Sequence, residues 1–171
     1  MKRKDFLRNA GLLAASGALW NTGLFANNQQ TLKVGLIGVN GMGWANLTAL
    51  LKVPNVVCTA LCDVDERILD KRIAELEKLQ TAKVKRIIDH QELLKGDLVD
   101  AVIIATPDHW HCLQMVDAVN AGKHVYVEKP IGNSIKECEA MVAAAQKHNS
   151  IVQVGQWQRS QQHFADAIDF V

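Results

Sequence analysis

Apolar runs alternate with amphipathic stretches along most of this chain. The runs at 34–39, 56–62 and 101–105 are continuous, which is typical of strands buried on both faces of a sheet. Residues 65–80 and 134–148 instead carry apolar side chains at helical spacing. The pattern predicts strands near 32–39, 56–62, 84–88, 100–106, 124–127 and 151–154, and helices near 43–52, 65–80, 109–121, 134–148 and from 161 onward, with a capped turn at 89–94.

Strands that alternate with helices indicate a parallel sheet with helices on both faces. The predicted fold class is therefore α/β, a doubly wound parallel sheet of the Rossmann type. Ligands in such folds bind beyond the carboxyl ends of the strands. That rule selects the loops at 38–43, 63–67, 106–111, 128–132 and 155–160 as places for function.

The turn after the first predicted strand is rich in glycine. Gly38 and Gly43 occupy the first and third positions of a G-x-G-x-x-G pattern, Asn40 stands at the second, and Gly41 and Met42 lie between. A strand, such a turn and a helix together favour dinucleotide binding, because the helix N-terminus offers free N–H groups to a pyrophosphate. A glycine-rich turn without a ligand is the alternative.

Asp63 ends the second predicted strand, 20 residues after Gly43. An acidic residue there accepts hydrogen bonds from an adenosine ribose and repels a 2′-phosphate, which favours NAD. Arg67, one turn into the next helix, leaves NADP open. Asp63 could instead cap that helix, but Asp65 could serve the same purpose.

The loop after the fourth strand carries Thr106, Pro107, Asp108, His109 and His111. Pro107 fixes the direction in which the chain leaves the sheet. Asp108 could cap the next helix. The two histidines are two residues apart, so on a helix they point in different directions, and this spacing is poor for one metal ion. We expect no metal.

The loop after the fifth strand reads Glu128-Lys129-Pro130. A lysine beside a bound nicotinamide could donate a proton or polarise a substrate hydroxyl, which makes Lys129 the candidate catalytic residue. The alternative is a surface lysine paired with Glu128. The residue types alone do not separate these readings.

Composition limits the classes of function. The chain has 171 residues, 49% hydrophobic and 22% charged, which suits one globular domain of ordinary size. A net charge of +1 gives no electrostatic footprint for nucleic acid. The cysteines lack C-x-x-C spacing and are expected to be buried thiols; they are Cys58, Cys62, Cys112 and Cys138.

Residues 1–26 have the order of a signal peptide: a basic start, a short apolar stretch, and a small residue, Ala26, at the expected cleavage point. The start resembles a twin-arginine export motif, with Lys4 where the second arginine belongs. The chain is therefore expected to be exported, to the periplasm or beyond, with no membrane contact after cleavage. The general secretory route stays open, and the alternative is an amphipathic helix that is retained.

Four stretches stand in order at familiar spacings, namely 34–43, 105–111, 121–130 and 152–155. Together they resemble the glucose–fructose oxidoreductase/inositol dehydrogenase (Gfo/Idh/MocA) family over about residues 32–171. The Glu-Lys-Pro loop is the most specific part of the resemblance. Asn40 departs from the usual glycine of the turn.

The resemblance implies a Rossmann domain, over 31–156, that binds NAD or NADP. It implies that Lys129 helps to bind cofactor and substrate, that Glu128 belongs to the same site, and that Thr106, Pro107 and His111 line the cofactor. The implied activity is an NAD(P)-dependent oxidoreductase acting on a hydroxyl of a sugar, sugar derivative or cyclitol.

The family also has a C-terminal α+β substrate domain. Residues 157–171 are expected to be its start, with the rest missing from this chain. On that interpretation the chain binds dinucleotide but does not transfer hydride by itself, and the full-length protein is a homo-oligomer. Two alternatives remain: a glycosidase of similar architecture that keeps NAD bound, whose members tend to lack the lysine, and a non-catalytic NAD-binding module.

Overall fold

The computed structural model describes residues 31–170, so the predicted signal peptide lies outside the described residues. The strands are β1 (Leu32–Ile37), β2 (Val56–Cys62), β3 (Lys85–Ile87), β4 (Ala101–Ile104), β5 (His124–Glu128) and β6 (Val152–Gly155). The α-helices are α2 (Gly41–Leu50), α3 (Glu66–Leu76), α4 (His90–Leu93), α5 (His111–Asn120), α6 (Ile135–His148) and α7 (Gln162–Phe170). Short 3-10 helices, η1 (Asp108–Trp110) and η2 (Trp157–Ser160), precede α5 and α7.

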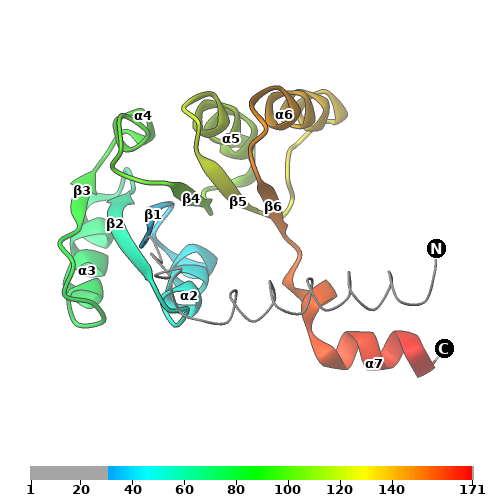
Figure 1. Cartoon of the computed structure of the whole chain (residues 1–171), viewed down its shortest axis with the longest axis horizontal. Coiled ribbons are helices and arrows are strands. Elements are labelled where there is room, and N and C mark those ends of the chain that lie inside the picture. The colour runs from blue at the N-terminus through cyan, green and yellow to red at the C-terminus, as the bar shows by residue number, and fades with distance from the viewer. Residues whose placement is uncertain (1–30, 171) are drawn as a thin grey trace, which may run out of the picture. The chain divides into compact units, whose positions relative to one another are not determined.

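All six strands form one parallel sheet in the order β3-β2-β1-β4-β5-β6. Helices α4, α5 and α6 cover one face, and α2 and α3 cover the other (Figure 1). From β1 in the middle of the sheet the chain winds outward to β2 and β3, and it then reverses its direction of winding by returning to β4 on the other side of β1. This is the doubly wound Rossmann topology predicted from the sequence, and its switch point lies where β1 and β4 end.

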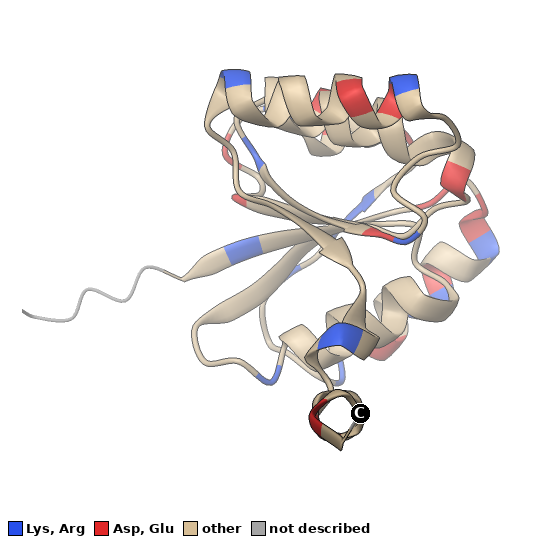
Figure 2. Ribbon diagram, turned by 90° about the vertical axis from the view of Figure 1, so that its right-hand side faces the viewer, with Lys and Arg blue, Asp and Glu red and all other residues tan. Residues whose placement is uncertain are grey.

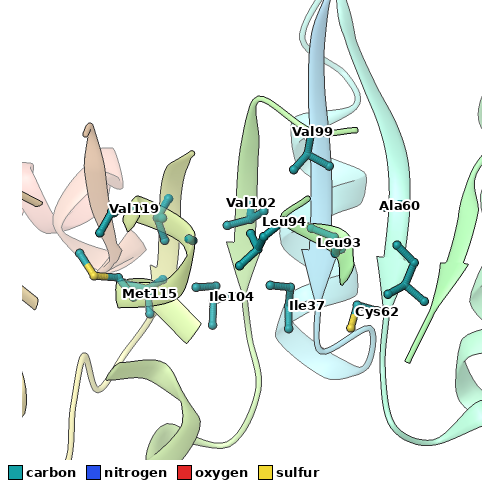
Figure 3. Close-up of a cluster of buried hydrophobic side chains, with 14 of the residues drawn as sticks. Ile37, Ala60, Cys62, Leu93, Leu94, Val99, Val102, Ile104, Met115 and Val119 are labelled. Carbon is teal, nitrogen blue, oxygen red and sulfur yellow. The ribbon is translucent and has the colours of Figure 1, made fainter. Parts of the chain in front are cut away.

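Apolar residues form a separate core on each face of the sheet. One cluster includes Ile37, Ile104 and Met115, and packs under α4, α5 and α6 (Figure 3). The other includes Leu36, Leu47 and the α3 residues Leu69 and Leu76. The strands contribute to both clusters because alternate side chains point to opposite faces, which explains their continuous apolar sequence.

Side-chain caps fix the starts of several helices. Asp65 accepts a hydrogen bond from the Arg67 N–H, and Asp89 accepts one from the Gln91 N–H. Ser134 and Glu137 form the predicted capping box at α6. Asp65, and not Asp63, is therefore the cap of α3, which leaves Asp63 available for another role.

Some predicted boundaries were wrong. Helix α2 begins at Gly41 instead of residue 43, so Gly41 and Met42 lie inside its first turn. Helix α3 ends at Leu76 instead of residue 80, and a 3-10 turn occupies the start of the helix predicted at 109–121. Asp108 does not cap α5, since Trp110 is the N-cap residue and makes no capping bond with its side chain.

Charged residues lie mainly on the helices and turns, and the strands carry few of them (Figure 2). Within residues 31–170, no helix is both long and apolar enough to cross a membrane.

Candidate functional site

A cleft with a volume of about 700 Å³ opens at the carboxyl ends of β1, β2, β3 and β4. Gly38, Asn40, Asp63, Thr106 and Pro107 all line it, although they come from three separate loops. This volume is in the range of small-molecule and cofactor sites. The cleft lies at the switch point of the sheet, where the fold brings the glycine turn and the loop after β4 together.

The glycine turn is shaped by two close contacts that only glycine permits. Gly38 has a φ of +86°, and a Cβ there would lie 2.7 Å from the backbone of Ala105 and Thr106. A Cβ on Gly43 would lie 2.1 Å from the Gly38 carbonyl oxygen. These contacts let α2 start directly against the carboxyl ends of β1 and β4, with its N-terminus at the cleft. Gly41 also has positive φ but meets nothing, and Met42 is exposed.

Asp63 joins the glycine turn to the loop after β2. Its Oδ2 accepts the Val39 N–H at 2.9 Å, and its Oδ1 accepts the Asp65 N–H at 3.0 Å. Each carboxylate oxygen can accept more than one hydrogen bond. Asp63 can therefore hold the turn and still accept a hydroxyl from a ligand in the cleft that it lines.

Arg72 on α3 reaches across to the same turn. Its Nε donates to the Val39 carbonyl at 3.2 Å, and its Nη2 donates to the Asn40 Oδ1 at 3.3 Å. Its guanidinium also lies 4.7 Å from the centre of the Trp44 ring, a cation–π contact. Arg72 and Trp44 were not predicted from the sequence, because their roles depend on how α2 and α3 lie beside the turn.

His111 is buried below the loop after β4 instead of facing the cleft. Its Nδ1 lies 2.7 Å from the Pro130 carbonyl oxygen, and its Nε2 lies 2.8 Å from the Thr106 carbonyl oxygen. The Thr106 hydroxyl donates to the Oε1 of Gln114 at 2.7 Å. His111 therefore ties the loop after β4 to the loop after β5.

A second contact joins these loops. The Asn133 amide can be oriented so that both its nitrogen and its oxygen are hydrogen-bonded. In that orientation the nitrogen donates to Asp108 Oδ2 at 2.9 Å, and the oxygen accepts the His109 N–H at 3.1 Å. Among residues 31–170, no three His, Cys, Asp or Glu side chains are grouped to hold a metal ion. The absence of a metal remains a prediction.

Glu128 is a buried carboxylate at the end of β5, with only 4% of its surface exposed. Its Oε1 accepts from the Asn46 side-chain amide at 2.7 Å, and its Oε2 accepts the Lys129 N–H at 3.1 Å. Gly155 leaves the space for this carboxylate, since a Cβ there would lie 2.8 Å from Oε1.

Lys129 is exposed, and among the described residues its ammonium group forms no ion pair, so the suggested pairing with Glu128 is wrong. The Lys129–Pro130 peptide is cis. Lys129, Glu128, His111 and residues 41–43 do not line the cleft itself, and their contacts with a cofactor stay predictions.

A family model described as an oxidoreductase family with an NAD-binding Rossmann fold, Gfo/Idh/MocA, matches residues 32–156. The chain belongs to this family. The match begins at β1 and ends just after β6, so it contains the whole sheet. The Gfo/Idh/MocA resemblance seen in the sequence is thereby confirmed.

Curated Gfo/Idh/MocA relatives include glycoside hydrolases. A Glycosyl hydrolase family 109 protein 1 of Shewanella sp. (strain ANA-3) is 30% identical over 129 residues, which is 73% of this chain and 28% of that protein. An alpha-N-acetylgalactosaminidase of Shewanella oneidensis matches to the same extent. The chain thus spans about 28% of the length of these relatives.

Solved structures with the same fold include cyclitol dehydrogenases. A scyllo-inositol dehydrogenase from Lactobacillus casei with bound NAD(H) and scyllo-inositol has a TM-score of 0.72 at 28% identity. The match covers 82% of this chain and 42% of that one. A myo-inositol 2-dehydrogenase from Lactobacillus plantarum has the same TM-score at 25% identity, over 82% of this chain and 42% of that one.

Other residues that line the cleft were not predicted from the sequence. The cleft is also lined by Trp110, Leu113 and Gln114, and by Ile88 and Gln91. Trp110 keeps 44% of its surface exposed, which is unusual for so large an aromatic side chain. The signal was present in the sequence as a tryptophan in a loop at a strand's carboxyl end, but the same residue also fits a core position.

Proposed function

We propose that this chain is the dinucleotide-binding part of an NAD-dependent oxidoreductase that acts on a hydroxyl of a sugar, sugar derivative or cyclitol. The observation that carries the proposal is the cleft at the switch point, which is lined by Gly38 and Asp63 together. The inositol dehydrogenases support the proposal, because they share the fold over 82% of this chain.

The residues present fit a dinucleotide. Gly43 removes a side chain that would close the turn, and the first N–H groups of α2 point out of the helix at that turn. A pyrophosphate is stabilised there by these N–H groups and by the helix dipole. When bound, the nicotinamide would supply a hydride acceptor; the protein binds, orients and shields it.

The charges around Asp63 favour NAD over NADP. Asp63, Asp65 and Glu66 are acidic, and Arg67 is the basic residue within this turn. The Arg67 guanidinium lies 3.3 Å from Asp65 Oδ2, and this hydrogen bond lowers the pKa of the Asp65 carboxyl. Arg67 is therefore already paired, and a 2′-phosphate near Asp63 would meet net negative charge.

Lys129 is the residue proposed to act on the substrate. Glu128, fixed by Asn46, accepts the Lys129 N–H and so sets the backbone from which the lysine extends. The ammonium group is left without an ion-pair partner among the described residues, which lets it hydrogen-bond a substrate hydroxyl. Its chemical role would be to hold that hydroxyl and exchange a proton with it.

The test combines binding with turnover. NAD should bind in a calorimetric titration, and the complete enzyme containing this domain should form NADH from inositols or sugars, as followed by NADH absorbance. Lys129→Ala should reduce turnover far more than NAD affinity. If the folded protein bound neither NAD nor NADP, the proposal would be overturned.

A second candidate is a glycosidase of similar architecture that keeps NAD bound. It is favoured by the 30% identity to glycoside hydrolases, including an alpha-N-acetylgalactosaminidase. The presence of Lys129 favours the dehydrogenase. Release of nitrophenol from nitrophenyl N-acetylgalactosaminide, without net NADH formation, would support the glycosidase instead.

We also propose that the protein is exported and cleaved near Ala26, on the charge and hydropathy order of residues 1–26. Mass spectrometry of the protein from a periplasmic fraction is the measurement. A mature N-terminus at Met1 would contradict this proposal.

A further inference from the structure

Helix α2 differs from α3, α4 and α6 in how it begins. Those three helices have a side-chain cap, from Asp65, Asp89 and Ser134 respectively. The N-cap residue of α2 is Asn40, one of the best capping residues, yet its side chain makes no capping hydrogen bond. A residue suited to cap the helix is thus present and does not do so.

The Asn40 side chain is held by α3 instead. Its Oδ1, the atom that would cap α2, accepts from Arg72 Nη2 at 3.3 Å. Arg72 also donates to the Val39 carbonyl at 3.2 Å, so it holds the turn at two successive residues.

Arg72 has little freedom to move away. Its Nη1 is 2.5 Å from Glu75 Oε2, its guanidinium lies over the Trp44 ring, and 16% of its side chain is exposed. Contacts with both α2 and α3 therefore fix the direction of the fork that faces Asn40.

We propose that Arg72 is a positioning residue for the dinucleotide, which keeps the Asn40 side chain off the N-terminus of α2. The proposal rests on the proposed function. An asparagine cap would use the N–H of Met42, because the Gly43 N–H already donates to the Asn40 carbonyl oxygen at 3.0 Å. The Met42 N–H is one of the first-turn groups that a pyrophosphate needs. A glycine at position 40 would have no side chain that could cap α2. Because Arg72 holds the Asn40 side chain away, asparagine can occupy the position at which the G-x-G-x-x-G pattern has glycine.

A simpler role for Arg72 would be to add positive charge near an anion. The two roles differ in their dependence on Asn40. If Arg72 acts through Asn40, its removal matters only while Asn40 is present. If it acts by charge, its removal matters equally with glycine at that position.

The first measurement needs no cofactor. Amide proton shifts of Met42 and Gly43 are compared by NMR in the wild-type chain and in Arg72→Met, which keeps an apolar stem over Trp44. A new capping bond should move the Met42 proton downfield. The shift should be absent in Arg72→Met combined with Asn40→Gly.

The second measurement is NAD affinity by calorimetry in the four members of this double-mutant cycle. Arg72→Met should weaken NAD binding about fivefold, because a capping bond worth about 1 kcal/mol must be broken first. In the Asn40→Gly background the same change should have an effect below about twofold. Lys71→Met removes a charge from the neighbouring exposed position of α3 and is the matched control.

Equal losses of affinity in both backgrounds, or unchanged amide shifts in Arg72→Met, would overturn the inference. If Arg72→Met does not fold, Arg72→Gln retains a donor for Asn40 without the charge and should keep NAD affinity within about twofold of wild type; a fivefold loss would overturn the inference. If the wild-type chain binds no NAD, the proposed function fails, and the amide shifts alone decide whether Arg72 holds Asn40 off the helix.

Discussion

Single glycines decide whether the turn at the cleft can form. Gly38 and Gly41 both have positive φ, at +86° and +48°, but only at Gly38 would a Cβ meet backbone atoms, at 2.7 Å. The sequence pattern treats them as neighbours in one glycine-rich turn. The structure separates a glycine required by contact from one required by conformation alone.

Gly38→Ala should lower the free energy of unfolding by more than about 3 kcal/mol, because it combines positive-φ strain with overpacking against backbone. Gly41→Ala should cost about 1–2 kcal/mol, from strain alone. Urea unfolding of both variants is the measurement. Equal losses would mean that the Ala105 backbone moves aside easily.

Asp63→Ala should weaken NAD binding roughly 10- to 100-fold, because a charged acceptor contributes about 1.5–3 kcal/mol. It should also destabilise the chain, since the N–H groups of Val39 and Asp65 lose their acceptor. Calorimetric titrations with NAD and NADP on wild type and variant, together with urea unfolding of both, test these statements. Tighter binding of NADP by the wild type would contradict the role given to Asp63.

Two thiols should make the fold sensitive to alkali. Burial raises the pKa of Cys58 and of Cys62 from 9.0 to about 12. Between these values the unfolded chain loses protons that the native chain keeps, so the stability is complete below about pH 9 and is lost as the pH rises toward 12. The slope should be about 1.4 kcal/mol per pH unit for each thiol. Urea unfolding across this range should show a flatter decline after Cys58→Ala, and an unchanged slope would contradict the burial effect.

At the scale of the elements, helix caps and loop contacts set the edges of the site. The start of α6 is fixed by the capping box of Ser134 and Glu137, directly after the loop that carries Lys129. His111 and Asn133 join that loop to the loop after β4. The site is thus built from loops whose positions are fixed by the helices that follow them.

Ser134→Ala should cost about 0.5–2 kcal/mol of unfolding free energy, the usual value of an N-cap. Ser150→Ala, beyond the other end of α6, should change it by less than about 0.5 kcal/mol, because the Ser150 hydroxyl makes no hydrogen bond within residues 31–170. Urea unfolding compares the two. NAD affinity should stay unchanged in the Ser150 variant; equal destabilisation of both would argue against the cap.

At the scale of the whole molecule, the described residues bury a core on both faces of the sheet but leave apolar groups on α7. Phe164, Ile168 and Phe170 are 41%, 75% and 92% exposed. Phe164 and Ile168 are four residues apart, so they lie on the same side of the helix. Large exposed apolar patches mark interaction sites or cause association.

The chain should therefore associate as its concentration rises, with α7 in the contact. Ile168→Asp should reduce the association, whereas Ile135→Asp, at an equally exposed position of α6, should not. Sedimentation velocity over a range of concentrations is the measurement. A monomer throughout would contradict the expectation, and an effect of Ile135→Asp alone would move the contact to α6.

The sequence predicted the sheet, its helices and part of the site, for physical reasons that are easy to trace. Buried parallel strands are continuously apolar, and helix caps such as Ser134 have a local signature. Gly38, Gly43 and Asp63 were singled out because the turn imposes a fixed spacing, and of these Gly38 and Asp63 line the cleft. Arg72, Trp110 and the cross-links of His111 depend on how separate elements pack, and no local pattern encodes that. The burial of Glu128 was also invisible, since its space exists because Gly155 on the adjacent strand has no side chain.

The bare start of α2 has a consequence for the lifetime of the protein. Its first turn contains Gly41 and Gly43. Without a side-chain cap, this turn should open often in the cofactor-free chain and show fast amide hydrogen exchange. An anion held there would act as the missing cap, and ligand binding to the native state slows loss by unfolding through mass action. Proteolysis should therefore remove empty molecules before loaded ones, so the supply of dinucleotide would govern how much of the protein survives.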